Sequence, residues 1–370
     1  MPACYLDHNA SQPLRPAARA ALLAALEGEG NAASVHAFGR AQRRHLEQAR
    51  AAVAALAGLP PAAVVFTSGA TEANNLALKG LPAASLLLGG GEHPSVLAAA
   101  PAAGRLPLTA DGLIEPAGLA AALAALPAPT LVAIQAANNE TGVLQPLALL
   151  APLVRAAGGW LHVDAVQAAG RLPRALWADG ADSLALSAHK LGGPQGAGAL
   201  LLARDAPLTA QLAGGGQERR RRAGTEPVAL LAGFGAAAAE AADRQAAEAA
   251  RLLALRERLE AGLRRISAAT VIFGAGAPRL PNTTAFAVPG VAAETALAAL
   301  DLAGVALSSG SACSSGKVEP SHVLAAMGVA PGLARCALRA SLGWSSTAAE
   351  VDRFLAVWES HLARLEPSAA

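Results

Sequence analysis

Six short runs of almost wholly apolar residues lie in the first 202 positions of the chain. They occupy 62–67, 85–88, 131–136, 160–163, 183–186 and 198–202, and helix-like stretches separate them. A strand with one face in water alternates apolar and polar residues, whereas a strand covered on both faces is apolar throughout. The pattern therefore predicts an α/β fold in which helices flank a mostly parallel central sheet.

The pattern changes in the last third of the chain. Residues 236–265 are rich in Ala, Glu, Arg and Leu and contain no proline, which predicts one long helix. Beyond it, strands are expected at 271–273, 284–288 and 305–307, and helices at 293–303, 320–327 and 347–364. This part of the chain is expected to form a second, smaller α+β domain.

Composition argues against several classes of protein. No apolar run reaches the roughly 18 residues of a membrane span, and the N-terminus lacks the form of a signal peptide. We therefore expect a cytoplasmic protein without membrane contact. A net charge of +2 gives no support for nucleic-acid binding. Three cysteines without a CxxC pair predict neither a disulfide framework nor a metal site, and Cys4 and Cys336 are expected to be structural.

Polar side chains follow the predicted strands, at the sheet edge where open α/β folds bind ligands. Asp164 follows one strand, and Lys190 follows the next strand 26 residues later. Enzymes that use pyridoxal phosphate (PLP) need a lysine amine to bind the aldehyde and a carboxylate to keep the ring nitrogen protonated. The pair therefore predicts PLP. The alternatives are a helix N-cap for Asp164 and an exposed surface position for Lys190.

A phosphate site is expected where the run at 68–72 opens a helix. Free N–H groups there, including that of Ala70, and the hydroxyl of Thr71 suit a phosphate, although an ordinary N-cap is the alternative. Ser187 and His189 flank the lysine and are further candidates for phosphate binding.

Three more side chains are candidates at this edge. His93 follows a glycine run and could stack on a planar cofactor and exchange protons, or be incidental. Asn138 lies in a polar turn and could reach the cofactor hydroxyl or the substrate carboxylate. Asp164 and Gln167 are expected to open a helix, from which Gln167 could reach the phenolic oxygen of the cofactor.

Two residues near the C-terminus carry a second type of chemistry. Cys313 lies in a small, polar, glycine-bounded segment, which suits a nucleophilic thiol on a loop better than a chance surface cysteine. Arg339 ends an apolar stretch, and its guanidinium could bind an α-carboxylate or form an interdomain salt bridge.

Together these residues resemble the cysteine desulfurases of the nitrogen-fixation and iron–sulfur-cluster type, within the class V aminotransferase family. The likeness covers 5–10, 31–40, 66–80, 92–96, 138–146, 162–170, 187–198, 214–226, 309–324 and 339–343. The chain departs from the family in three respects. Ser11-Gln12 stand where two threonines are common, and Arg220 and Arg221 replace small or apolar residues. The C-terminal extension through which some members engage a scaffold protein is also missing, which leaves delivery to such a scaffold open.

The resemblance implies a homodimer of PLP fold-type I. The large domain would span 16–245, and the small domain would be made from 1–15 and 246–370. Sulfur would leave L-cysteine to form a persulfide on Cys313 and then pass to a sulfur-acceptor protein, for iron–sulfur clusters or thiolation. Lys190 would be the cofactor-binding lysine, and Thr225 would reach the phosphate of the second subunit. The arginine run at 219–222 would then belong to an intersubunit loop.

Three other activities remain open at this point. A selenocysteine lyase would need the same site, because sulfur and selenium substrates share geometry. Another PLP enzyme of the family, such as a transaminase, needs no cysteine like Cys313. A non-catalytic binding protein could lose both Lys190 and Cys313, and the chain keeps both.

Overall fold

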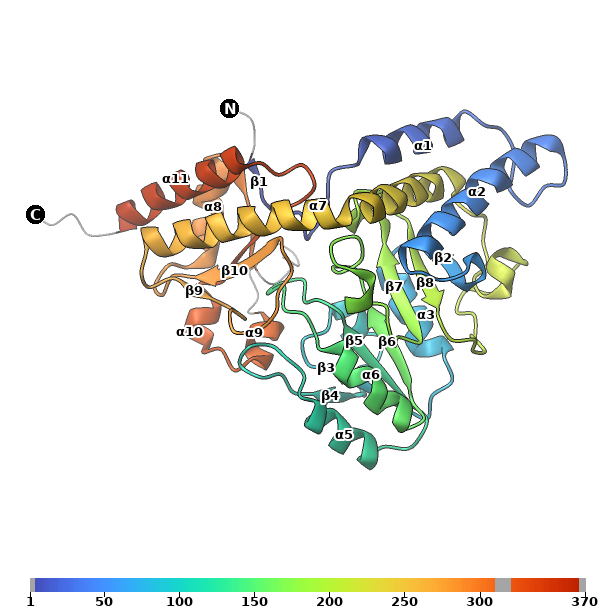
Figure 1. The fold of residues 1–370 in the computed structure, drawn as a ribbon, viewed down its shortest axis with the longest axis horizontal. Coiled ribbons are helices and arrows are strands. Elements are labelled where there is room, and N and C mark those ends of the chain that lie inside the picture. The colour runs from blue at the N-terminus through green and yellow to red at the C-terminus, as the bar shows by residue number, and fades with distance from the viewer. Residues whose placement is uncertain (1–3, 310–320, 366–370) are drawn as a thin grey trace, which may run out of the picture.

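A computed structural model describes residues 4–309 and 321–365 of the chain (Figure 1). Its larger sheet has seven strands in the order β2-β8-β7-β6-β5-β3-β4, and only β8 runs antiparallel to its neighbours. The strands are β2 (Val64–Thr67), β3 (Ser85–Gly89), β4 (Gly104–Leu106), β5 (Thr130–Gln135), β6 (Trp160–Asp164), β7 (Ser183–Ser187) and β8 (Gly198–Leu202). The six apolar runs are therefore confirmed as strands, and the short edge strand β4 adds to them.

Apolar cores cover both faces of this sheet, as the runs predict. Consecutive residues of one strand belong to different cores: Val132 of β5 packs in one, and Leu131 packs in the other. The covering helices are α1 (Pro16–Leu26), α2 (Ala37–Leu56), α3 (Ala70–Gly80), α4 (Pro94–Leu97), α5 (Pro116–Ala125) and α6 (Leu147–Ala156). Helix α3 covers one face, and α2, α5 and α6 cover the other (Figure 1).

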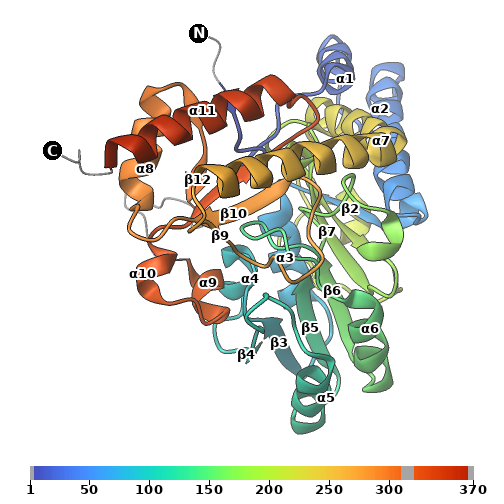
Figure 2. The same cartoon turned by 60° about the vertical axis from the view of Figure 1, so that its left-hand side comes forward.

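A second, antiparallel sheet has the order β12-β13-β10-β9. Its strands are β9 (Val271–Ile272), β10 (Thr283–Ala287), β12 (Ser308–Ser309) and β13 (Leu338–Ser341). Helices α8 (Ala293–Leu302), α9 (His322–Ala326), α10 (Pro331–Ala334) and α11 (Ala348–Leu365) accompany it (Figure 2). The N-terminal strand β1 (Cys4–Tyr5) pairs in parallel with β11 (Val305–Ala306), so the start of the chain lies beside its last third.

Helix α7 (Val228–Ile266) runs along both parts of the molecule (Figures 1 and 2). Phe234, in its first half, packs in the large core, and Leu259, in its second half, packs in the core of the smaller sheet. The boundary proposed at residue 245 falls inside this helix. The division into domains therefore stays a prediction.

The expected helix at Asp164 and Gln167 is wrong. Asp164 is the last residue of β6, and the chain continues as a series of turns. The Asp164 carboxylate accepts a hydrogen bond from the Val166 N–H at 3.1 Å, and Gly170 has a φ of 70°. This local bonding and the left-handed glycine favour turns over a helix.

Short 3-10 helices complete the described part: η1 (Pro61–Ala63), η2 (Arg174–Leu176), η3 (Ala188–Lys190) and η4 (Gln217–Arg220). Within the described residues, no helix is long and apolar enough to cross a bilayer. The same residues contain no group of three or more His, Cys, Asp or Glu side chains arranged to hold a metal ion.

Candidate active site

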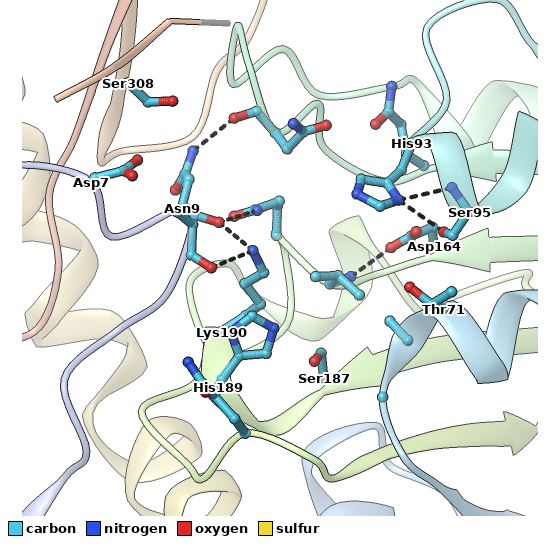
Figure 3. A pocket seen from close by; sticks show the side chains of 18 of the residues that line it. Asp7, Asn9, Thr71, His93, Ser95, Asp164, Ser187, His189, Lys190 and Ser308 are labelled. Atoms are coloured by element: carbon cyan, nitrogen blue, oxygen red, sulfur yellow. Dashed lines mark hydrogen bonds between the residues drawn. The ribbon is translucent and has the colours of Figure 1, made fainter. Parts of the chain in front are cut away.

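A cavity of about 790 Å³ lies between the carboxyl edge of the large sheet and the smaller sheet (Figure 3). Nine of the predicted site residues line it: Ala70, Thr71, His93, Asp164, Gln167, Ser187, His189, Lys190 and Arg339. The N-terminal segment contributes Asp7, Asn9 and Ala10 to the wall, and the small sheet contributes Ser308 and Ser309. Segments far apart in the sequence therefore enclose one space.

Lys190 points into this cavity from the 3-10 helix after β7. Its Nζ donates to the carbonyl oxygens of Asn9 at 2.5 Å and Ala10 at 2.8 Å (Figure 3). Burial is the main cause that lowers the pKa of Lys190 to about 7, and the nearby cations Arg171 and Arg339 lower it further. The amine is therefore often neutral near pH 7.

Asp164 is held by a buried chain of polar side chains. Its Oδ2 accepts from Asn74 Nδ2 at 2.8 Å. The other end of the Asn74 amide, Oδ1, lies 3.0 Å from His162 Nε2, and His162 Nδ1 lies 2.9 Å from Ser183 Oγ. Burial lowers the pKa of His162 to about 4, so its ring is neutral at pH 7. The chain fixes the position of a carboxylate at the floor of the cavity.

The start of α3 forms a second side of the cavity. The helix is preceded by Gly69, and no side chain caps this end. Strand β8 passes so close that a Cβ on Gly198 would lie 2.5 Å from the Gly69 Cα. Glu72, in the first turn, accepts from Arg222 at 2.8 Å, which ties the arginine run at 219–222 to this loop. Backbone N–H groups at such a helix start attract anions.

His93 and the phosphate candidate His189 both line the cavity. The Nδ1 of His93 lies 2.8 Å from Ser95 Oγ and accepts from the Ser95 N–H at 3.1 Å (Figure 3). Burial lowers the pKa of His93 and lowers that of His189 to about 4. His189 Nδ1 lies 3.3 Å from Ser11 Oγ. Both rings are therefore neutral over most of the physiological pH range.

Arg339 enters the cavity from β13 and is already partly engaged. Its Nη2 donates to Asp7 Oδ1 at 2.7 Å and its Nη1 to the Asn139 carbonyl at 3.0 Å. Its Nε is buried without a hydrogen-bond partner. The guanidinium is thus held in place by two of its five N–H donors. The ion pair joins two segments, 1–15 and 246–370, that are predicted to form one small domain.

Comparison with known proteins identifies the family. The family model described as Aminotransferase class-V matches residues 4–354. The chain belongs to this family. It is 39% identical to an IscS-like cysteine desulfurase of Mycobacterium tuberculosis (strain ATCC 25618 / H37Rv), over 99% of this chain and 98% of that protein. It is 41% identical to a cysteine desulfurase of Rhodobacter capsulatus over the same shares.

Solved structures of NifS-like proteins have the same fold. A NifS-like protein from Rickettsia africae ESF-5 superposes with a TM-score of 0.90 and 32% identity, over 98% of this chain and 99% of that one. The resemblance to the cysteine desulfurases and the expected fold are both confirmed. The class-V fold explains why the cavity lies at the carboxyl ends of β5, β6 and β7.

Three predicted site residues are not brought into this cavity by the described chain. The Asn138 side chain is buried, and its amide is already bonded within the protein. The amide oxygen accepts from the Glu140 and Thr141 N–H groups, and the nitrogen donates to the Gly91 carbonyl. Its neighbour Asn139 lines the cavity instead. Thr225 lines two smaller cavities. Cys313 lies outside the described residues. The other two cysteines of the class-V chain are buried, as expected.

Sequence reasoning missed several residues of this class-V site. Asn9 accepts from Lys190, Asn74 donates to Asp164, and Arg171 lies next to Gln167. A signal existed for Asn74, because asparagine is a poor helix former and stands here in a helix interior, where a buried hydrogen-bonding role would explain it. The backbone carbonyl of Asn9 carries no sequence signal of this kind.

The chemistry of these residues fits PLP. Three groups line one cavity: the Lys190 amine of lowered pKa, the buried Asp164 carboxylate and the uncapped start of α3. The amine suits the aldehyde of PLP, the carboxylate suits its ring nitrogen, and the helix start suits its phosphate. A volume of about 790 Å³ lies within the range of small-molecule sites. Arg339 adds a cation to the lining of the same cavity.

Proposed function

We propose that the protein is a cysteine desulfurase, which uses PLP to convert L-cysteine to L-alanine and a persulfide on Cys313. The observation that carries the proposal is the Lys190 amine of lowered pKa in a cavity shared with Asp164 and Arg339. The full-length likeness to cysteine desulfurases supports the substrate.

Bound PLP supplies an aldehyde that captures the substrate amine and a ring that accepts electrons from the substrate Cα. Lys190 would hold the cofactor, and Asp164 would face its ring nitrogen. Gln167 would reach the phenolic oxygen and His93 would stack on the ring. The phosphate would be bound by Ala70, Thr71, Ser187 and His189, with Thr225 from a second copy of the chain.

The residues of the chain divide the remaining work. Lys190, once released, is the base that removes the Cα proton of the substrate, since a pKa of about 7 leaves much of it neutral. Arg339 would bind the substrate carboxylate, while Asp7 and Asn139 hold the guanidinium in place. Asn138 stays a predicted helper at the carboxylate or the cofactor, although its amide is engaged in the turn.

Cys313 is proposed as the sulfur nucleophile. Its thiolate attacks the substrate sulfur, the S–S bond forms, and the electron pair of the breaking C–S bond stays with the substrate carbon, which is then protonated to give alanine. Ser309, the last described residue before this segment, lines the cavity. The persulfide would then pass its sulfur to an acceptor protein for iron–sulfur clusters or thiolation.

A homodimer is proposed on the evidence of an apolar surface near Thr225. Leu26 is 64% exposed, Val35 88% and Phe38 59%, on or beside α1 and the start of α2. A groove of about 420 Å³ beside them includes Thr225. A second copy packed here would cover these side chains and bring Thr225 towards its site. The cytoplasmic location expected from the sequence stays a prediction.

Product analysis tests the activity. The purified protein, given L-cysteine and a reductant, should release sulfide and alanine in equal amounts. Lys190→Ala should lose the visible absorbance of the cofactor. Cys313→Ala should keep that absorbance but lose sulfide release, and mass spectrometry of the wild type should find one added sulfur on Cys313.

A matched cysteine variant controls this test. Cys336 is buried and donates to the Gly332 carbonyl at 3.4 Å, away from the cavity. Cys336→Ala should therefore keep sulfide release. Normal sulfide release from Cys313→Ala would reject the persulfide role, and absence of cofactor absorbance in the wild type would reject the PLP chemistry.

A further inference from the structure

Arg171 differs from the other buried arginines of the described chain. The others pair with carboxylates: Arg15 with Glu240 and Glu248, Arg50 with Glu218, Arg279 with Glu260, and Arg339 with Asp7. Arg171 is 6% exposed, and its acceptors among the described residues are all neutral carbonyl oxygens. A buried charge without an opposite charge is costly, which suggests that this one serves the site.

The contacts of Arg171 join the two elements that hold the predicted cofactor residues. Its Nη1 donates to the backbone oxygen of Gln167 at 3.0 Å and also to the Gln167 side-chain oxygen. Its Nη2 donates to the Lys190 carbonyl at 3.4 Å. One guanidinium therefore ties the turn after β6 to the 3-10 helix after β7.

These contacts fix the orientation of the Gln167 amide. Because Arg171 occupies the amide oxygen, the amide nitrogen is left to face the other way, where it donates to the Asn9 carbonyl at 3.0 Å. Gln167 lines the cavity. Its amide therefore has its remaining N–H donor, rather than an acceptor, available to an anionic oxygen bound there.

We propose that Arg171 is a positioning residue of the active site, which holds the Gln167 amide in its donor orientation and places a fixed positive charge behind Lys190. The proposal deepens the proposed function, because it rests on the role of Lys190 as the cofactor lysine. Arg171 reaches the chemistry through these two residues and is not itself among the lining residues of the cavity.

The charge of Arg171 acts on Lys190 among several neighbours. The groups that influence or respond to the charge of Lys190 are Asp7, His93, Asp164, Arg171, His189 and Arg339. Asp7 and Asp164 raise the pKa of Lys190, and Arg339 is itself balanced by Asp7. After burial, Arg171 is the next largest cause of the lowered pKa. Its removal should therefore make the amine more basic.

The test measures the basicity of Lys190 in the cofactor-free protein. Trace acetylation from pH 5 to 10, followed by mass spectrometry, gives the pH midpoint of labelling at Lys190, with the exposed Lys79 as internal reference. Arg171→Met should raise the Lys190 midpoint by about one pH unit, the lower end of the effect of a nearby charge. Arg171→Lys keeps the charge and should restore the wild-type midpoint.

A distant variant and a second neutral variant complete the design. Arg265→Met removes an arginine whose side chain is 67% exposed, and should leave the Lys190 midpoint unchanged. If Arg171→Met does not fold, judged by circular dichroism, Arg171→Gln takes its place. Equal Lys190 midpoints in the wild type and a folded neutral variant would overturn the proposal. Failure of both neutral variants to fold, with Arg171→Lys folded, would overturn it in favour of a purely structural role.

The outcome is separable from that of the proposed function. Labelling uses neither cofactor nor substrate, so a shifted midpoint supports Arg171 even in a protein that releases no sulfide. In the holoprotein, loss of the oriented Gln167 amide should also move the pH midpoint of the cofactor absorbance in Arg171→Met. If Arg171→Met shifts the labelling midpoint of Lys190 but leaves the pH midpoint of the cofactor absorbance unchanged, the proposed orientation of Gln167 by Arg171 is refuted.

Discussion

Asn74→Ala offers the sharpest test of how the site is held, because Asn74 is fully buried and bonds to three partners. The substitution leaves Asp164 Oδ2 without its donor at 2.8 Å and His162 Nε2 without its partner at 3.0 Å. Ser95 also loses a donor, but it keeps its contact with His93. Two buried polar groups therefore lose their partners.

The expected loss of stability follows from these two groups. An unsatisfied buried polar group costs ~1–3 kcal/mol, so two cost ~2–6 kcal/mol. Alanine is a better helix former than asparagine, which returns about 0.5 kcal/mol. We therefore expect the free energy of unfolding to fall by about 3 kcal/mol.

Asn75 supplies the matched control. It is the same residue type, one position further along α3, and its amide bonds to the Thr71 carbonyl and to Lys79 at the surface. Asn75→Ala should change the free energy of unfolding by no more than about 0.5 kcal/mol. Urea titrations of both variants, compared at equal m-values, give the difference. A difference below ~1 kcal/mol would refute the claim that Asn74 holds Asp164.

Two further predictions concern a buried acid and a close backbone approach. Burial raises the pKa of Glu140 from 4.5 to about 7, so its contribution to stability is complete below pH 4.5 and is lost as pH rises to 7. Between pH 5 and 8, the wild type should lose about 2.5 kcal/mol of unfolding free energy through this group. Glu140→Gln can still accept from Ser321 and should not show this loss in urea titrations; parallel profiles of the two proteins would contradict this. A Cβ on Gly198 would push against the Gly69 backbone, so Gly198→Ala should retain less cofactor absorbance after dialysis. Gly118→Ala, which meets no atom within 4 Å, should retain the wild-type level, and equal retention by the two variants would count against the close approach.

The central sheet was predictable because a strand that is buried on both faces has apolar residues at nearly every position. β5 (Thr130–Gln135) is buried at all six positions, and its sequence is apolar except at the two ends. The polar residues just after the strands, such as Asp164 and Lys190, were then placed by the general rule for open sheets. Local pattern and topology together were sufficient for this edge of the cavity.

The small sheet was harder to predict because its strands are short and pair across long distances. β12 has two residues and β13 has four, and Ser309 pairs with Leu338. Segments this short carry no periodicity, so Arg339 could be recognised as a candidate cation but not as a strand residue. The turn at Asp164 was missed for a different reason, since capping residues favour both helices and turns.

The N-terminal segment contacts the site through residues that are far from Lys190 in sequence, so sequence patterns could not predict these contacts. Asn9 lies 181 residues from Lys190, yet its carbonyl accepts the lysine amine, and the same carbonyl accepts the Gln167 amide. Neutral carbonyls suit this task, because a carboxylate at hydrogen-bond distance would raise the pKa of the amine and keep it charged. Asp7, two residues earlier, bonds instead to Arg339. The segment therefore places its carboxylate against Arg339 and offers only backbone oxygens to the lysine, an arrangement that favours a neutral amine.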